Sequence, residues 1–141
     1  MKIFVDTGAF LALTDASDGL HSRAKIFYDS LTAGDRLFTS NYVVDETITR
    51  LRYTLGLSAA VSFAEAALKG RLFSVIYVDS DLEKTALALL KKYKDKKLSF
   101  TDCTSMAMAS ERNFDAVFAF DQDFKRTGFR MVPAMDEGAE S

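Results

Sequence analysis

The sequence has few of the residues that build disulfides and zinc sites. Its 141 residues include one cysteine, Cys103, and one histidine, His21. A lone cysteine excludes an internal disulfide, and these two residues cannot supply the ligands of a Cys/His zinc centre. A nuclease site with two histidines is excluded as well, and a Ser-His-Asp triad would have to use His21. Carboxylates are the catalytic groups that remain in quantity.

Long apolar runs, a secretory signal and an excess of positive charge are also missing. No uninterrupted apolar stretch has membrane-spanning length, and the first apolar run meets Asp6 too soon for a signal peptide. We therefore expect a cytoplasmic protein with no membrane association. A net charge of −2 is not that of a protein that holds nucleic acid by charge alone. A nucleic-acid substrate would thus require another source of positive charge, such as a divalent cation.

Apolar strands alternate with helical segments along the whole chain. The predicted strands are residues 3–5, 36–39, 72–78, 116–120 and 129–132. This alternation predicts one α/β domain over residues 1–141 with a mostly parallel sheet, followed by a frayed acidic tail at 134–141. Right-handed crossovers then gather the carboxyl ends of the strands at one edge of the sheet.

Helix starts can be predicted from capping residues. Ser40 or Asn41 is expected to cap a helix over 42–55, whose apolar residues recur at helical spacing. Ser58 is expected to cap the next helix, and Ser80 with Glu83 is expected to form a capping box. A further helix over 103–112 is rich in small residues and begins beside Thr101 and Asp102.

Four carboxylates stand where these elements begin or end. Asp6 closes the first strand, Glu46 lies in the first turns of the helix over 42–55, Asp102 starts the helix over 103–112, and Asp121 closes the strand over 116–120. We expect them to meet at the carboxyl edge of the sheet, where open α/β folds bind ligands. Clustered carboxylates repel unless a hard cation such as Mg²⁺ or Mn²⁺ lies among them. The pattern therefore predicts a metal site suited to phosphodiester hydrolysis.

Each acid also has an ordinary structural interpretation. Asp6 would suit a strand end by binding backbone amides. Glu46 precedes Arg50 by four residues and would form an exposed helical ion pair. Asp102 favours a helix N-terminus, and Asp121 would start a turn. Only their joint placement at one edge favours chemistry over these alternatives.

Several stretches, taken in order, resemble the PIN-domain ribonucleases, specifically the VapC-like toxins of bacterial and archaeal toxin–antitoxin pairs. The matching stretches are IFVDTGAF at 3–10, DGLHSRA at 18–24, SNYVVDET at 40–47, LSFTDC at 98–103 and AVFAFDQDF at 116–124. Together they cover nearly the whole chain. The resemblance implies a PIN-like three-layer α/β/α fold around a mostly parallel sheet of about five strands.

The same resemblance implies a Mg²⁺- or Mn²⁺-dependent endoribonuclease that acts on RNA, forms a homodimer and is inhibited by a small antitoxin protein. By position, the residues that match the family's acidic quartet are Asp6, Glu46, Asp102 and Asp121. Asp123 falls where some members place a fifth acid. Thr7 and Thr101 occupy polar positions beside the first and third acids.

Other interpretations stay open. The chain would also suit a housekeeping RNA-processing nuclease, or a PIN-like binding domain without catalysis. A receiver-type signalling domain would need two adjacent acids after the first strand, whereas Thr7 follows Asp6 here. A nucleotide-binding Rossmann enzyme is disfavoured because no glycine-rich loop follows that strand. The lysine-rich stretch 91–97 would suit either RNA phosphate or a solvated helix end.

Overall fold

The computed structural model describes residues 1–134 and has a parallel sheet between two helical layers. The strands are β1 (Lys2–Val5), β2 (Arg36–Ser40), β3 (Ser74–Ile76), β4 (Ala116–Phe118) and β5 (Met131–Val132). Their order is β3-β2-β1-β4-β5, and every neighbouring pair is parallel. The predicted tail at 134–141 lies outside the described residues, apart from Ala134.

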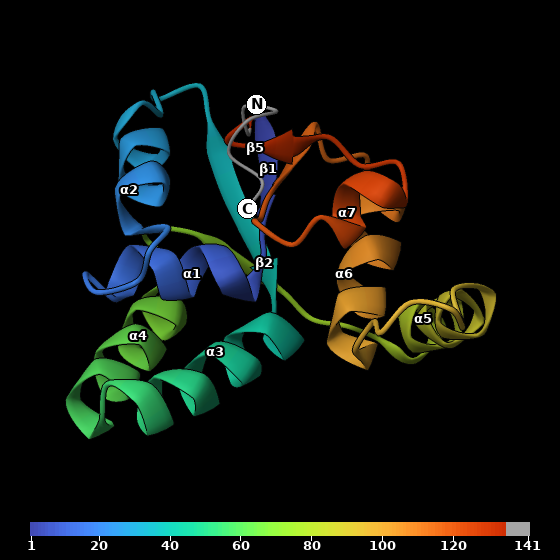
Figure 1. Cartoon of the computed structure of the whole chain (residues 1–141), viewed down its shortest axis with the longest axis horizontal. Coiled ribbons are helices and arrows are strands. Elements are labelled where there is room, and N and C mark those ends of the chain that lie inside the picture. Colours follow the sequence, from blue (N-terminus) through green and yellow to red (C-terminus); the bar gives the residue numbers. More distant parts are fainter. Residues whose placement is uncertain (135–141) are drawn as a thin grey trace.

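The helices divide between the two faces of the sheet (Figure 1). One layer holds α1 (Thr7–Thr14), α2 (His21–Asp29), α3 (Asn41–Thr54) and α4 (Leu57–Lys69). The other holds α5 (Ser80–Lys92), α6 (Phe100–Glu111) and α7 (Asp123–Arg126). The three-layer α/β/α fold that the resemblance implied, with a mostly parallel sheet of about five strands, is confirmed, and all strand pairs of the sheet are parallel. Within residues 1–134, every helix is too short or too polar to cross a bilayer.

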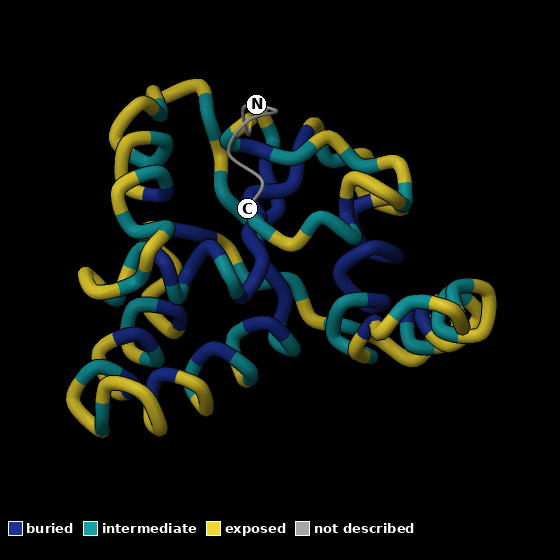
Figure 2. The backbone as a smooth tube through the Cα atoms, in the orientation of Figure 1, coloured by how far each residue is buried: buried dark blue, intermediate teal, exposed yellow. Residues whose placement is uncertain are grey.

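The core lies along the two central strands and the helix rich in small residues. Ile3, Phe4 and Val5 of β1 are fully buried, as expected for a continuous apolar run covered on both faces. Figure 2 shows the buried class following β1, β4 and α6. Residues 103–109 of α6 are all buried because alanines and a serine let the helix approach the sheet closely. The central strands are therefore held rigidly up to the point where they end.

The extents of the strands differ from the prediction. The β-prone run 72–78 forms only the three residues of β3, because this edge strand pairs with β2 through those three positions alone. β4 ends at Phe118, two residues before the predicted end, so Asp121 lies three residues beyond the strand. The chain stays beside β5 after that point, since the Ala119 N–H donates to the Val132 carbonyl at 3.2 Å.

Two predicted helix caps are wrong and one is confirmed. Ser40 caps α3, and its Oγ accepts the Val43 N–H at 3.1 Å. Ser58 does not cap α4, because that helix starts earlier, after Gly56 at φ 105°. The Ser80–Glu83 capping box is absent: Asp79 has the extended backbone of an N-cap, and its Oδ1 accepts the Leu82 N–H at 2.8 Å.

Candidate active site

Asp6 is fixed by its backbone while its carboxylate takes no part in capping. The Asp6 N–H donates to the Phe118 carbonyl at 3.0 Å, which ties the residue to the end of β4. Its carbonyl accepts from Ala9 and Phe10 at 3.1 and 3.3 Å, so Asp6 is the N-cap of α1. The side chain makes no capping hydrogen bond and only 5% of the residue is exposed. The Asp6 carboxylate is therefore buried, and helix capping does not occupy it.

The electrostatics show that the four predicted acids converge. Burial, followed by the charges of Asp102, Glu46 and Asp121, raises the pKa of Asp6 to about 7, against a partly opposing hydrogen bond from the Thr7 amide. Among residues 1–134, no cation lies within ion-pair distance of Asp6. We call these four carboxylates the acidic rim. They come from β1, α3, α6 and the segment after β4, so the predicted meeting at one edge of the sheet occurs.

Glu46 and Asp102 face each other across the rim from α3 and α6. Burial and the Asp102 charge raise the pKa of Glu46, while Arg50 and the Thr7 and Thr101 hydroxyls lower it. Burial also raises the pKa of Asp102, and its bonds with Ser99 oppose that shift. Both helices thus present partly desolvated carboxylates of like charge to the same space.

The three acids other than Asp6 also make the ordinary structural contacts that the sequence suggested for them. Asp102 forms a capping box with Ser99, whose N–H donates to Asp102 Oδ2 at 3.0 Å. Asp121 Oδ1 accepts the Asp123 N–H at 3.0 Å in a tight turn. Glu46 lies 3.8 Å from Arg50, a distance at which an exposed pair contributes little. Asp6 differs, because within residues 1–134 its side chain caps no helix and forms no ion pair, and the Thr7 amide offsets only part of the rise in its pKa.

The accessory positions also lie at the rim. Thr7 is 3% exposed, and among the described residues its Oγ1 has no hydrogen-bond partner of acceptable geometry although it is close enough to lower the pKa of Glu46. Thr101 acts on Glu46 in the same direction from the first turn of α6. Asp123 raises the pKa of Asp102 and forms a 3.3 Å ion pair with Arg126. Within residues 1–134, Thr7 Oγ1 is thus a buried polar atom without a well-formed hydrogen bond.

A hard divalent cation fits the chemistry of this donor set. Within residues 1–134, the rim offers oxygen donors, a buried carboxylate without a counter-charge and a Thr7 hydroxyl without a well-formed hydrogen bond. A hydrated Mg²⁺ or Mn²⁺ would satisfy these groups. As the side chains of residues 1–134 stand, no three His, Cys, Asp or Glu side chains are arranged to hold one ion. Mg²⁺ often uses one or two carboxylates and keeps its waters, so a closed shell of three is not required.

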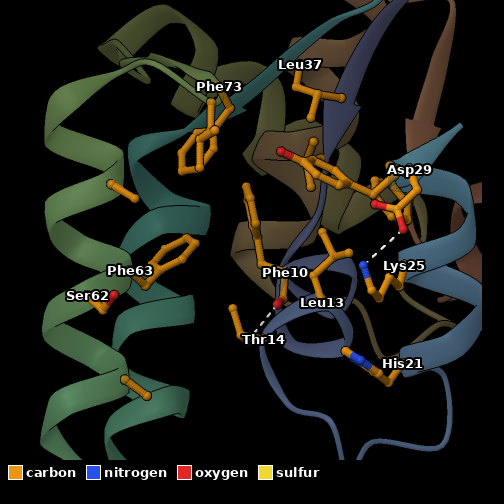
Figure 3. A pocket seen from close by; sticks show the side chains of 16 residues that line it. Phe10, Leu13, Thr14, His21, Lys25, Asp29, Leu37, Ser62, Phe63 and Phe73 are labelled. Carbon is orange, nitrogen blue, oxygen red and sulfur yellow. Dashed lines mark hydrogen bonds and ion pairs between the residues drawn. The ribbon is translucent and has the colours of Figure 1, made fainter. Parts of the chain in front are cut away.

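An apolar cavity that the sequence analysis missed lies in the layer of α1–α4 (Figure 3). Its volume is about 570 Å³, and its lining includes the mutually packed rings of Phe10, Phe63 and Phe73. His21 lines it too, with Nδ1 2.7 Å from the Ala12 carbonyl, so the lone histidine belongs to this cavity and not to the rim. Apolar lining residues look like core residues in a sequence, so no pattern marked the cavity.

Comparisons with known proteins agree with this architecture. A family model described as PIN domain matches residues 3–130. The chain is 37% identical over 127 residues to the 23S rRNA-specific endonuclease VapC20 of Mycobacterium tuberculosis, spanning 90% of this chain and 95% of that protein. It is 31% identical over 114 residues to a VapC ribonuclease of Archaeoglobus fulgidus, spanning 79% and 72% of the two chains.

Solved structures give the same result. The crystal structure of Mycobacterium tuberculosis VapC20, described as a sarcin-ricin loop cleaving toxin, superposes with a TM-score of 0.84 at 37% identity and covers 90% of this chain and 95% of that one. FitAcB from Neisseria gonorrhoeae superposes with a TM-score of 0.67 at 17% identity, covering 92% and 95%, which supports the fold alone.

Proposed function

This chain belongs to the PIN-domain family, and from that premise we propose that it is a VapC-type endoribonuclease whose catalytic groups are the acidic rim. The predicted resemblance to VapC-like toxins is confirmed by the family match over residues 3–130 and by 37% identity to a VapC endonuclease. The predicted enzyme class agrees with the activities of both curated relatives. In this proposal residues 1–141 act as one PIN domain in the cytoplasm.

One observation carries the assignment of the site. Asp6 is a buried carboxylate with a pKa near 7 and no cation beside it in the described chain, and three further acids from distant segments raise that pKa or that of each other. Fold stability alone does not explain this arrangement, because clustered carboxylates without a nearby cation destabilise the folded chain. The arrangement is explained if the charge is neutralised by a cation and by the reaction that the cation supports.

The roles of the side chains follow from their surroundings. Asp6, Asp102 and Asp121 would hold Mg²⁺ or Mn²⁺ directly, and Glu46 directly or through a water. A divalent cation bound there supplies positive charge to the scissile phosphate and makes a water more acidic. Glu46 is half-buried, and burial together with the Asp102 charge raises its pKa, so it is suited to accept a proton from a water beside the cation. Thr101 orients Glu46, and the Asp123 amide orients Asp121.

Ribosomal RNA is the first substrate to test. The relative that is 37% identical is named as specific for 23S rRNA, and its structure is described as that of a sarcin-ricin loop cleaving toxin. Five lysines in residues 91–97 lie at the end of α5 and in the connection that leads into α6, the helix that carries Asp102. Lys94 and Lys97 are exposed and have no ion-pair partner within residues 1–134. We assign them to RNA phosphate.

A small antitoxin protein is the proposed inhibitor, and the apolar cavity is its proposed docking site. The cavity would accept apolar side chains of such a segment beside Phe10, Phe63 and Phe73. The ion pair between Lys25 and Asp29, 2.9 Å apart, stands at its lining and would meet polar groups of the same segment.

A second copy of the chain is the proposed partner of another face. Leu68 and Tyr77 are 84% and 72% exposed and line a groove between α3, α4 and the edge strand β3. Large exposed apolar side chains gathered over one groove are typical of protein interfaces. Val44 and Ile48 of α3 line the same groove, so a homodimer would bury this face.

Cleavage of purified ribosomal RNA tests the proposed function. With Mg²⁺ or Mn²⁺ present, we expect the wild-type protein to cut at a defined position that sequencing of the new RNA ends identifies, and excess EDTA to stop the reaction. Asp6→Asn should leave the RNA intact. Intact RNA with the wild type under both metals, or equal cutting by Asp6→Asn, would contradict the proposal. Growth arrest on expression that a cognate antitoxin relieves would separate a toxin from a housekeeping nuclease.

A further inference from the structure

The boundary between α3 and α6 is a place where like charges are held together. Glu46 of α3 and Asp102 of α6 carry like charge, and after burial the Asp102 charge is the next cause of the raised pKa of Glu46. Among residues 1–134, no ion pair joins these two helices. Some other contact must therefore keep α3 close to α6 beside the acidic rim.

Tyr42 makes the contacts that bridge this boundary. Its hydroxyl donates a hydrogen bond to Glu83 Oε2 in the first turn of α5. Its ring centroid lies 6.1 Å from that of Phe100, the first residue of α6 and two residues before Asp102. Because Tyr42 and Glu46 are four residues apart in one helix, they lie on the same face of α3. One side chain thus links the Glu46 face to α5 and α6 of the opposite layer.

The groups that Tyr42 contacts are themselves fixed. The Asn41 side chain accepts the Val78 N–H at 2.8 Å, which ties the start of α3 to the segment before α5. Asp79 caps α5, so the first turn that carries Glu83 is well defined. α5 packs along α6 in the same layer. A hydrogen bond from Tyr42 to Glu83 therefore positions α3 relative to the α5–α6 pair as a unit.

We propose that Tyr42 is a positioning residue of the acidic rim, whose bond to Glu83 and ring contact with Phe100 hold Glu46 opposite Asp102. This inference rests on the proposed function, since it assumes that the rim binds a cation, and it adds three residues outside the acidic rim: Tyr42, Glu83 and Phe100. Outer residues that orient metal ligands characteristically affect metal affinity and activity without touching the substrate. The Tyr42 hydroxyl is already engaged by Glu83 and the residue is half-buried, so stacking on an RNA base is the less favoured role.

Tyr42→Phe is the decisive variant because it keeps the ring against Phe100 and removes only the hydroxyl. We expect Mn²⁺ affinity, measured by calorimetry, and kcat for RNA cleavage to fall about 10-fold to 100-fold, with KM for RNA unchanged. Tyr53→Phe is the matched control, since Tyr53 lies on the same helix and is 85% exposed. It should behave as the wild type in both measurements.

Variants of the acceptor separate positioning from folding. Glu83→Gln keeps an oxygen acceptor and should retain near wild-type Mn²⁺ affinity, whereas Glu83→Ala should reproduce Tyr42→Phe. The double variant should lose no more than either single one, because both remove the same bond. In the metal-free protein, amide exchange at residues 43–47 should be faster in Tyr42→Phe than in Tyr53→Phe.

Three outcomes would overturn the inference. Wild-type Mn²⁺ affinity and kcat in Tyr42→Phe would show that the bond positions nothing. A lower melting temperature with unchanged affinity and kcat would leave a purely structural role, and a raised KM alone would make Tyr42 an RNA contact. Failure of the proposed function is distinguishable: a wild-type protein that binds Mn²⁺ but cuts no RNA would remove the nuclease assignment, while Mn²⁺ affinity and amide exchange would still test Tyr42.

Discussion

The acidic rim and the apolar cavity are neighbours with opposite chemistry. Val5 and Phe118, which are paired in the sheet, line the cavity, and Asp6 follows Val5 directly at the rim. At the rim, charged groups lack compensation among the described residues, whereas in the cavity apolar surface lacks cover. Under the proposed function, a cation and the RNA substrate would compensate the charge at the rim, and a protein segment would cover the apolar surface of the cavity.

The largest expected effect is on RNA cleavage, which a substitution at the rim should slow and a substitution at the cavity should not. Asp6→Asn should lower kcat for RNA cleavage by roughly 10²–10³-fold or more, the range for removing one group that stabilises charge in a transition state. Asp29→Asn at the cavity is the matched control. It breaks only an exposed ion pair with Lys25 and should leave the cleavage rate unchanged. Equal loss in both variants would erase the functional distinction between rim and cavity.

The rim should also control how stability depends on pH. In the metal-free protein, the pKa of Asp6 is about 7 in the folded state and near 3.8 when unfolded, so the unfolded chain releases the proton first. Stability should therefore fall as pH rises from about 4 to 7, by up to about 4 kcal/mol at roughly 1.4 kcal/mol per pKa unit. Thermal unfolding in EDTA should give a higher melting temperature at pH 5 than at pH 8.

Two controls tie that pH dependence to Asp6. Asp6→Asn should remove most of the loss, because its side chain is neutral at every pH. Adding Mg²⁺ at pH 8 should raise the melting temperature of the wild type more than that of the variant. A stability that rises between pH 5 and 8 in EDTA would contradict the electrostatics described for the rim.

A charge introduced into the cavity should weaken antitoxin binding and leave RNA cleavage unchanged. Ser62 is exposed on α4 and lines the cavity, so Ser62→Glu introduces a charge where an antitoxin's apolar groups would lie. We expect about a 10-fold weaker antitoxin affinity, corresponding to roughly 1.4 kcal/mol, and unchanged cleavage of RNA without antitoxin. Ser58→Glu, on the same helix but outside the cavity lining, should bind antitoxin normally. Undiminished binding by Ser62→Glu would place the antitoxin elsewhere.

The smallest effect concerns the lysines beside the rim. Replacing Lys94 and Lys97 by Gln should reduce the slope of log affinity for RNA against log salt by about 1.4 to 1.8, since each phosphate contact contributes roughly 0.7 to 0.9. Binding is measured in the Asp6→Asn protein so that the RNA stays intact. Lys69→Gln with Arg71→Gln removes two charges from the other layer and should leave the slope unaltered. An equal change in both pairs would indicate non-specific attraction.

The two regions also differ in how far a sequence reveals them. The rim was predicted because Asp6, Glu46, Asp102 and Asp121 are polar interruptions at element boundaries, and parallel topology says where such boundaries meet. The cavity was not, because Phe10, Phe63 and Phe73 have the spacing of ordinary core residues. Whether apolar side chains close on one another or leave a space depends on the relative placement of three helices, which no local pattern encodes.

The caps and strand ends show the same limit. Ser80 and Glu83 have the spacing of a capping box, yet Asp79 precedes them with extended backbone and takes the cap. Glu83 is thereby free to accept from Tyr42, a contact between residues 41 positions apart. The run 72–78 has strong β-propensity throughout, but only three residues find a neighbouring strand. Contacts with residues distant in the sequence thus determined how far the strand extends and which partner Glu83 has.

The capping box of α6 has a consequence for which ion the rim can accept. Asp102 Oδ2 is engaged by the Ser99 amide, and Asp121 Oδ1 is engaged by the Asp123 amide. Each amide occupies one lone pair and restricts how the carboxylate can turn, so coordination through both oxygens, which Ca²⁺ often uses, would compete with these hydrogen bonds. If the rim binds a cation as proposed, the helix start and the turn would favour a smaller octahedral ion that takes one oxygen from each carboxylate, through backbone amides that never touch the ion.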